Sequence, residues 1–310
     1  MIGLLLAKKI ASMFLIIAMG FTIVKAGVLK TEDSKPISMI ALYLITPCMI
    51  ISSFQIELTE EIRHGFLLSM LAAVIILCTV IALTTVFRKA ARFDSVEIVS
   101  IVYTNSGNLI IPIVLSLFGK EWVVYLSAYN IVLNFLMWTH AKGVLSGDKK
   151  PDLRKILLNP NMIAIFIGLF LLFSGVQLPE ILADAVDSVG SIVGPACMLV
   201  TGMLMAGMNA KKVLSYKRAW VPILLRLVAV PLLAIALYKV LHLASLTDNG
   251  MSVLTITVMA CAAPSASSVV QMAQTFQSDA AADYAAAVNV VGTLLCIITL
   301  PIMVTLFTMG

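Results

Sequence analysis

The residues best suited to chemistry form a polar run at positions 103–112, inside a stretch that is otherwise apolar. The run contains Asn105, Ser106, Gly107 and Asn108, and it ends at Pro112. Proline frees a backbone carbonyl and each amide side chain needs hydrogen-bond partners, so this run would be costly where it faced lipid. We therefore expect it to line a cavity or to face another helix.

The partner that we expect is the segment 262–271, where small residues surround Pro264 and allow a close approach of two backbones. Its candidate binding side chains are Ser265, Ser268 and Gln271. We predict helix breaks at Pro112 and Pro264, each with a helix N-terminus that carries unpaired N–H groups and a partial positive charge. Two such termini attract an anion, most simply a carboxylate. The alternative is a pair of proline kinks packed by small residues.

Four further polar residues are weaker candidates for the same site. They are Ser52 and Ser53 in one apolar stretch, and Asn130 and Asn134 in another. The two asparagines are four residues apart, which places them on one side of a helix. Each of the four fits a hydrogen bond between helices equally well.

Arg226 is the only basic residue well inside an apolar stretch. An ionisable group at such a position predicts a function, here as a counter-charge or a gate. The alternatives are that its side chain extends to the membrane surface, or that it binds carbonyls freed by Pro222.

The acidic residues all lie in loops or near the ends of apolar stretches, so no carboxylate is placed to relay protons at the membrane centre. Sodium coupling through carbonyls, Ser268 and Gln271 stays open, and so does transport without a coupled ion. We predict no cofactor and no metal centre, because the five cysteines show no CxxC spacing. No sequence motif of an intramembrane enzyme or an ATP-driven pump is present, so we predict that the protein is not an enzyme.

These residues must be positioned by helices within a membrane. Of 310 residues, 61% are hydrophobic and only 12% are charged, whereas soluble domains are about 25% charged. The apolarity has no period of two, which favours helices over a β-barrel. We predict an all-α protein with ten membrane spans, at 10–29, 37–56, 65–87, 95–118, 122–141, 157–175, 188–209, 219–241, 250–276 and 281–307.

The basic residues orient these spans and explain the net charge of +5 without nucleic acid. Of the 21 Lys and Arg residues, fifteen fall in the loops after spans one, three, five and seven, and five fall on the other side. Positive charge gathers on the cytoplasmic side, so both termini are predicted to lie outside the cytoplasm.

The two halves of the chain resemble each other weakly. Pro47 and Pro195 occupy similar segments, Pro-Cys-Met and Pro-Ala-Cys-Met. The number of residues between Pro112 and Pro264 is similar to the number between Pro47 and Pro195. Because each half has five spans, the second is predicted to be inverted in the bilayer, a pattern typical of secondary transporters. The predicted units are 1–141, a short basic cytoplasmic linker at 142–156, and 157–310.

The chain resembles the auxin efflux carrier family, in its short-loop prokaryotic branch of permeases and malonate-transporter-like proteins. The resemblance extends over the whole chain. It depends on Asn105 seven residues before Pro112, on the break at Pro264, on Arg226-Leu227 ahead of Pro231, and on the closing Thr299-Leu300-Pro301.

The resemblance implies the inverted-repeat fold shared with plant PIN auxin transporters and bile-acid sodium symporters, in which spans four and nine cross at their prolines. It also implies a scaffold of spans one, two, six and seven, often dimeric, and a moving bundle of spans 3–5 and 8–10. Asn105 matches the asparagine that contacts the substrate carboxylate. Ile110 departs from the usual glycine at that position, which implies a bulkier crossing and a different substrate.

Together these observations predict a secondary transporter in the cell (inner) membrane that carries a small organic anion by alternating access. Asn105 and Asn108 would hydrogen-bond the carboxylate. Its partners would be the substrate, the lipid bilayer and a second copy of the chain, and no nucleic acid. A sodium-coupled symporter of the same fold and a channel-like facilitator are the alternatives.

Overall fold

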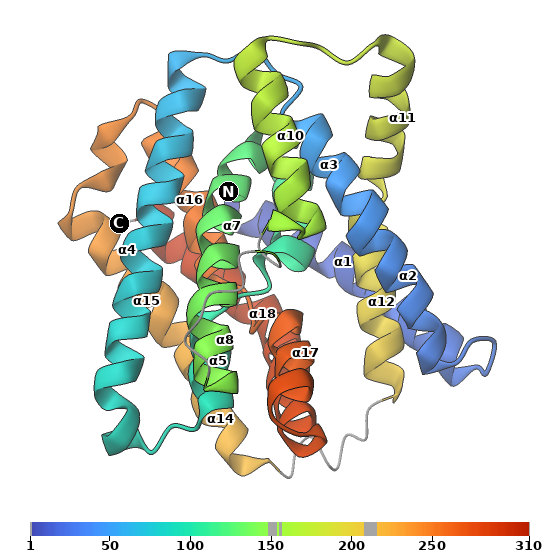
Figure 1. Ribbon diagram of the computed structural model, residues 1–310, viewed down its shortest axis with the longest axis vertical. Helices are drawn as coiled ribbons and strands as arrows, with labels where there is room; N and C mark the ends of the chain where they lie inside the picture. The colour runs from blue at the N-terminus through green and yellow to red at the C-terminus, as the bar shows by residue number, and fades with distance from the viewer. Residues whose placement is uncertain (1, 148–153, 155–156, 208–215, 310) are drawn as a thin grey trace.

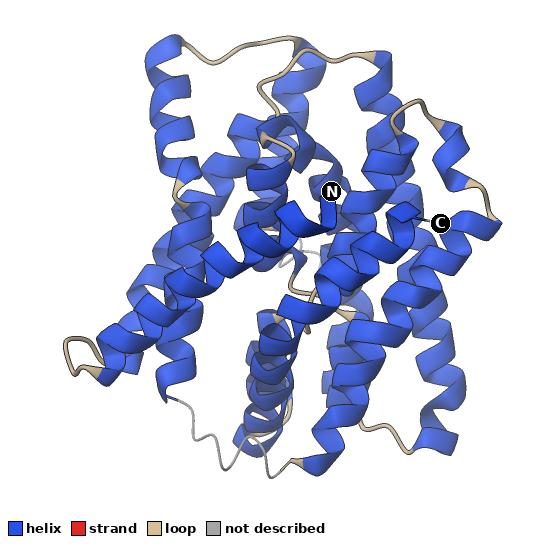
Figure 2. Ribbon diagram, turned by 180° about the vertical axis from the view of Figure 1, so that it is seen from behind, coloured by secondary structure: helices blue, strands red, loops and turns tan. Residues whose placement is uncertain are grey.

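The computed structural model describes residues 2–147, 154, 157–207 and 216–309, with side chains described from residue 12 onward. Parts of the predicted linker 142–156, and Lys149, Lys150, Lys155, Lys211 and Lys212 of the charge count, lie outside the described residues. The side chains of Lys8 and Lys9 do so too. Over the described residues the chain is all helical, without a named strand (Figure 2).

The helices of the first half of the chain lie between residues 2 and 146. They are α1 (Ile2–Lys25), η1 (Thr31–Asp33), α2 (Ser34–Ile40), η2 (Ala41–Ile45), α3 (Thr46–Ser53), α4 (Glu60–Ala91), α5 (Ser95–Val102), η3 (Ser106–Ile110), α6 (Ile111–Leu117), η4 (Lys120–Trp122), α7 (Val123–Leu136), η5 (Met137–Ala141) and α8 (Lys142–Ser146).

The helices of the second half lie between residues 160 and 309. They are α10 (Pro160–Ser174), α11 (Glu180–Ser191), α12 (Val193–Gly207), η6 (Lys217–Ala219), α14 (Trp220–Leu224), η7 (Leu225–Ala229), α15 (Val230–Val240), η8 (Leu243–Leu246), α16 (Gly250–Ala262), α17 (Ser267–Phe276) and α18 (Asp279–Met309). The seventh predicted span therefore begins earlier, at Glu180, and is interrupted at Ile192.

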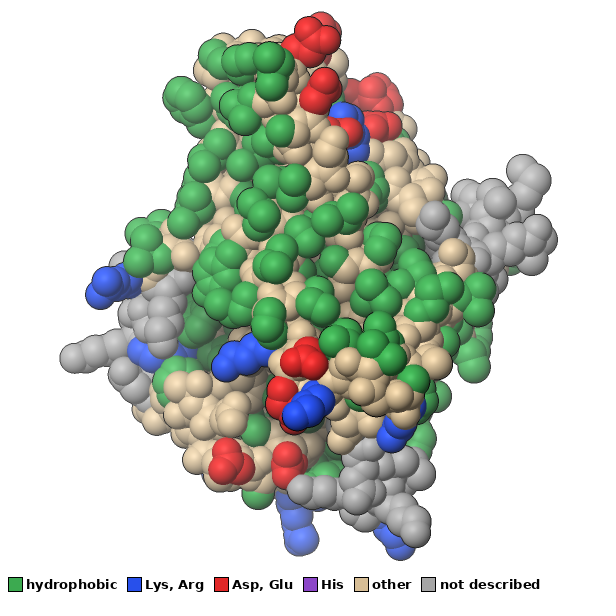
Figure 3. Space-filling model, turned by 90° about the vertical axis from the view of Figure 1, so that its right-hand side faces the viewer, with side chains coloured by type: hydrophobic (Ala, Val, Ile, Leu, Met, Phe, Trp, Pro, Cys, Tyr) green, Lys and Arg blue, Asp and Glu red, His purple; other side chains and the backbone are tan. Residues whose placement is uncertain are grey.

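Six helical stretches in the described chain are long and apolar enough to cross a membrane. They are Thr31–Ser53, Glu60–Ala91, Lys120–Ser146, Glu180–Gly207, Lys217–Val240 and Asp279–Met309. Four shorter apolar helices accompany them, at Ser12–Lys25, Ser106–Leu117, Pro160–Ser174 and Gly250–Ala262. Large apolar side chains such as Phe170 and Ile298 are exposed, as expected of surfaces that face lipid. Figure 3 shows apolar side chains over the middle of one face and charged ones mainly toward its two ends.

Proline explains why several of these helices contain a π-helical turn. The turns η2, η3 and η7 each end two residues before a proline, at Pro47, Pro112 and Pro231 respectively. A proline removes one N–H from the helical ladder, and a wider turn just before it lets the helix continue. Pro112 therefore lies inside a continuous helix, Ser106–Leu117, and the predicted helix break at Pro112 is wrong.

Glycines bring α1 and α12 together. At Gly202 of α12, an added methyl group would overlap the backbone carbonyl of Ile17 in α1, and at Gly20 it would overlap that of Leu199. Without side chains between them the two backbones pack directly, as is common where helices associate in lipid. The crossing of α1 and α12 depends on these two glycines.

One end of the fold is held by a buried carboxylate. Glu97, fully buried at the start of α5, accepts hydrogen bonds from Arg218 Nε (2.6 Å) and Nη2 (3.1 Å) and from the Tyr284 hydroxyl (3.0 Å). Glu97 also forms a capping box with Asp94. These contacts join the beginnings of α5, α14 and α18 and fix the direction in which α5 enters the protein.

Candidate functional site

Two interrupted helices cross near the centre of the molecule. The chain leaves the helical conformation at residues 103–105, between α5 and η3, and again at 263–266, between α16 and α17. Thr104 and Ser265 form an isolated antiparallel bridge there. The N–H of Asn105 donates to the Pro264 carbonyl (2.8 Å), and that of Ala266 donates to the Tyr103 carbonyl (3.0 Å). The two segments thus pair the backbone groups that each interruption leaves without a helical partner.

The second interruption surrounds Pro264, where the sequence predicts it. The first lies at 103–105 and ends seven residues before Pro112. It brings Asn105 itself into the crossing, because Asn105 is the residue that precedes the new helix at Ser106.

The new helix N-termini lie next to each other. One begins at Ser106 and the other at Ser267. The Asn105 amide Nδ2 donates to the Ser267 hydroxyl at 3.4 Å, which links them. Their first N–H groups give this place a partial positive charge.

A chamber of about 90 Å³, here called the inner chamber, lies at the crossing. Its lining includes Asn105, Gly107, Asn108, Asn130 and Asn134. Ser268, Ala266, Ile111 and Ile165 add to the wall. The described lining contains amides, hydroxyls and apolar groups, and no carboxylate, so it offers neutral hydrogen-bond donors to an anion.

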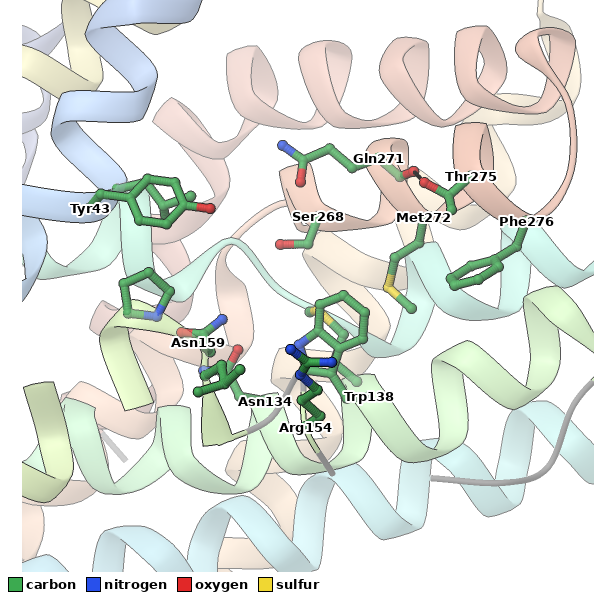
Figure 4. Close-up of a pocket in the computed structure, with 14 residues that line it drawn as sticks. Tyr43, Asn134, Trp138, Arg154, Asn159, Ser268, Gln271, Met272, Thr275 and Phe276 are labelled. Atoms are coloured by element: carbon green, nitrogen blue, oxygen red, sulfur yellow. Dashed lines mark hydrogen bonds between the residues drawn. The ribbon is translucent and has the colours of Figure 1, made fainter. Parts of the chain in front are cut away.

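The inner chamber shares several lining residues with a larger cavity of about 740 Å³, here called the large cavity. In Figure 4, α17 provides one wall with Ser268, Gln271 and Thr275, and Asn134 and Trp138 lie across from it. The residues common to both spaces are Leu42, Asn134, Met137, Asn159 and Ser268. A small molecule in the large cavity would therefore reach the crossing from one side.

A third space of about 50 Å³, here called the rear chamber, also borders the crossing. Its polar lining consists of Asn105, Asn108, Thr201, Ser267, Asn289 and Thr293. Asn105 and Asn108 line the inner and rear chambers alike.

Ser106 lies behind the inner chamber and orients one of the amides. Its buried hydroxyl donates to Asn130 Oδ1 at 2.6 Å. With that oxygen engaged, the amide N–H groups of Asn130 are the part available to a ligand. Asn134 Nδ2 donates to the Asn130 carbonyl at 2.9 Å, within the same helix.

The structure does not bring Ser52 and Ser53 to these spaces. The Ser52 hydroxyl donates to Asp187 Oδ1 (2.6 Å), and the Ser53 hydroxyl donates to the Ile50 carbonyl of its own helix (2.6 Å). Ser265 is buried in the bridge and its hydroxyl has no partner among the described residues. Gln271 lines only the large cavity of the three spaces.

Two asparagines that line the inner chamber, Asn159 and Asn161, are not among the site residues predicted from the sequence. They belong to an Asn-Pro-Asn sequence at the start of α10, where Asn159 caps the helix by accepting from the backbone N–H groups of Asn161 (3.0 Å) and Met162 (3.3 Å). An N-cap asparagine before proline is a recognisable signal for a helix start, although not for a binding site.

Arg226 is also at the crossing, fully buried. Its guanidinium donates to the carbonyls of Ile101 (2.8 Å), Val102 (3.1 Å), Ala263 (3.1 Å) and Cys261. These carbonyls belong to the ends of α5 and α16. Arg226 therefore neither extends to the membrane surface nor binds carbonyls freed by Pro222.

Among the described residues, no set of charged ligands for sodium or another metal lies at the crossing. The described residues contain no group of three His, Cys, Asp or Glu side chains that could hold a metal ion. The oxygens that the chambers offer are neutral.

A bundle of apolar helices with two interrupted helices crossing beside a polar chamber defines a membrane transport protein. The sequence profile of the family described as membrane transport protein matches residues 5–151 and 148–304. The chain therefore belongs to this family, the auxin efflux carrier family. A comparison with curated proteins finds no match.

Proposed function

We propose that the protein is a secondary transporter for a small organic anion, most simply a carboxylate. The observation that carries this proposal is the meeting of two helix N-termini, at Ser106 and Ser267, beside a chamber lined by asparagine amides. Helix N-termini and amide N–H groups both stabilise negative charge in a low-dielectric site. Asn105 and Asn108 bind the carboxylate in this proposal, and Asn130 donates from the opposite wall.

The proposed architecture is two inverted repeats of five helices each, 1–141 and 157–310, joined by a short cytoplasmic linker. The non-helical segments at 103–105 and 263–266 occupy similar places in the two halves, and their antiparallel pairing supports inversion. The two stretches matched by the family profile divide the chain near the same boundary. In this proposal spans one, two, six and seven form the scaffold, and two copies of the chain associate through it as a homodimer.

Transport proceeds by alternating access in this proposal. The large cavity includes Arg154, which lies in the loop that the charge pattern assigns to the cytoplasm. It also includes Phe276 at the end of span nine, which the alternation of ten spans would place on the same side. In this proposal the conformation is open toward the cytoplasm, and both termini lie on the outer side of the inner membrane. Movement of spans 3–5 and 8–10 against the scaffold, in a homodimer, would expose the chamber to the other side.

Counterflow into proteoliposomes tests this proposal and separates a carrier from a channel. The purified protein is first screened for thermal stabilisation by mono- and dicarboxylates, with and without sodium, since a ligand that binds the folded state stabilises it. A stabilising carboxylate should then show saturable counterflow. Stabilisation that needs sodium would favour the symporter, and currents far above carrier turnover would favour the channel-like facilitator.

Asn105→Ala tests the site itself. We expect binding of that carboxylate to weaken about tenfold or more, because a buried donor to a charged group contributes roughly 1.5–3 kcal/mol. Asn249→Ala is the matched control, since Asn249 donates to the Tyr125 hydroxyl (3.1 Å) and lines none of the three spaces. Parent-like binding and transport by a well-inserted Asn105→Ala protein would refute the site assignment.

A further inference from the structure

Arg226 joins the ends of two helices that approach the crossing from opposite halves of the chain. Its hydrogen bonds reach Ile101 and Val102 at the end of α5, and Cys261 and Ala263 at the end of α16. All of these partners are backbone carbonyls, and no carboxylate among the described residues forms an ion pair with Arg226. The positive charge of this buried side chain is therefore compensated by carbonyls at helix ends and not by an acidic side chain.

The charges of the helix ends and of Arg226 at the crossing can be added approximately. A helix carries roughly +0.5 elementary charge at its N-terminus and −0.5 at its C-terminus. The C-termini of α5 and α16 together present about one negative charge, and the guanidinium, which stays protonated in proteins, supplies one positive charge. The N-termini of Ser106–Leu117 and of α17 keep their positive potential, about one charge in sum.

We propose that Arg226 cancels the two helix C-termini and thereby leaves the chambers with a net positive potential that selects a singly charged anion. Arg226 lines none of the three spaces, so it is a positioning residue that does not touch the ligand. This inference rests on the proposed function for the identity of the ligand, but not for the potential itself.

A second observation points to a ligand at the same place. The Thr104 side chain is only 2% exposed and lines the inner chamber. Its hydroxyl lies near the Tyr129 hydroxyl but forms no well-made hydrogen bond with a described residue. An unpaired buried hydroxyl is costly unless a ligand or water completes it. A carboxylate oxygen in the inner chamber is a suitable acceptor for it.

The potential can be measured without knowing the substrate. Ser268→Cys places a thiol at the border of the inner chamber and the large cavity. Purified full-length protein reacts with the anionic 2-sulfonatoethyl and the cationic 2-trimethylammonioethyl methanethiosulfonate, and labelling of protein without Ser268→Cys is subtracted. The ratio of the two rates, compared with that for free cysteine, reports the sign of the local potential.

We expect this ratio to favour the anionic reagent about fivefold or more, and Arg226→Gln to lower it about tenfold, because one buried charge acts on the two reagents in opposite directions. Arg226→Lys should stay within about twofold of the parent ratio, since it keeps the charge. Lys217→Gln is the matched control, because it removes an exposed cation of the same segment and should leave the ratio unchanged.

Two results would overturn the inference. One is a parent ratio equal to that of free cysteine, which can be measured even if Arg226→Gln does not fold. The other is an unchanged ratio in monodisperse Arg226→Gln protein, which would reduce Arg226 to a purely structural bond between helices. A positive potential in a protein that neither binds nor transports any carboxylate would leave this inference standing and refute the proposed function.

Discussion

At the scale of single residues, the candidate site consists of amides whose orientation is set by neighbouring hydroxyls and backbone groups. Ser106 holds the oxygen of Asn130, and Asn105 reaches across the crossing to Ser267. Such hydrogen bonds contribute modestly to stability in membrane proteins, about 0.6 kcal/mol on average. The bond from Ser106 also engages the oxygen of Asn130 and so presents the amide donors of Asn130 to the inner chamber.

Ser106→Ala should therefore weaken binding of a carboxylate more than it weakens the fold. We expect a loss of about 0.5–1.5 kcal/mol in unfolding free energy and a several-fold loss in affinity, because Asn130 is freed to turn its oxygen toward the ligand. Thermal unfolding and ligand titration of the purified protein measure both. Ser116→Ala is the control, since that hydroxyl bonds only within its own helix, to the Ile113 carbonyl. Equal effects of the two substitutions would contradict the orienting role.

At the scale of helices, close backbone packing positions the elements that carry the site. The crossing of α1 and α12 depends on Gly20 and Gly202, where any side chain would meet backbone atoms that cannot move away easily. Gly107 is different, because an added methyl group there would enter open space at the inner chamber.

Gly202→Ala is expected to destabilise the protein by about 1–3 kcal/mol or more, since the α1 and α12 backbones must separate to admit the methyl group. Gly107→Ala should be nearly neutral for stability. Yield of monodisperse protein and the thermal unfolding midpoint provide the comparison. If Gly107→Ala proved the more damaging of the two, the packing argument for α1 and α12 would fail.

At the scale of the whole molecule, one ion pair joins parts that our proposal allows to move. Lys120 Nζ lies 3.0 Å from Asp187 Oδ1, which also accepts from Ser52. Figure 1 shows α11, which carries Asp187, at the opposite end of the molecule from α17 and its wall of the large cavity. In our proposal the pair connects the start of span five, in the bundle, with span seven of the scaffold at the end away from the large cavity, which is closed in this conformation.

Lys120→Glu is expected to favour opening at that end and to lower the rate at which a neutral thiol reagent labels Ser268→Cys from the cytoplasmic side. The shift should reach at most about fivefold, because both side chains are about half exposed and such pairs contribute roughly 0–1 kcal/mol. The double variant Lys120→Glu/Asp187→Lys should restore the parent rate, as a double-mutant cycle requires. Additive effects of the two changes would exclude a role for the pair in closing this end.

The sequence alone determined where the apolar helices lie and which polar residues cannot face lipid, because hydrophobicity and the missing N–H of proline are local properties. It indicated Asn105, Asn108 and Pro264, and each lies at or beside the crossing. It misplaced the first interruption, since a π-helical turn before Pro112 absorbs the proline.

Only the tertiary structure decided which groups meet. Arg226 bonds carbonyls up to 125 positions away, Ser52 meets Asp187, and Asn159 enters the inner chamber from a helix start in the second half. These pairings depend on how helices cross, which the pattern of apolar and polar residues along one helix does not specify. The amino-acid types alone indicate that one cation and several amide side chains lie within the membrane. Only the crossing of the helices shows that the cation binds helix ends and that the amides line a chamber.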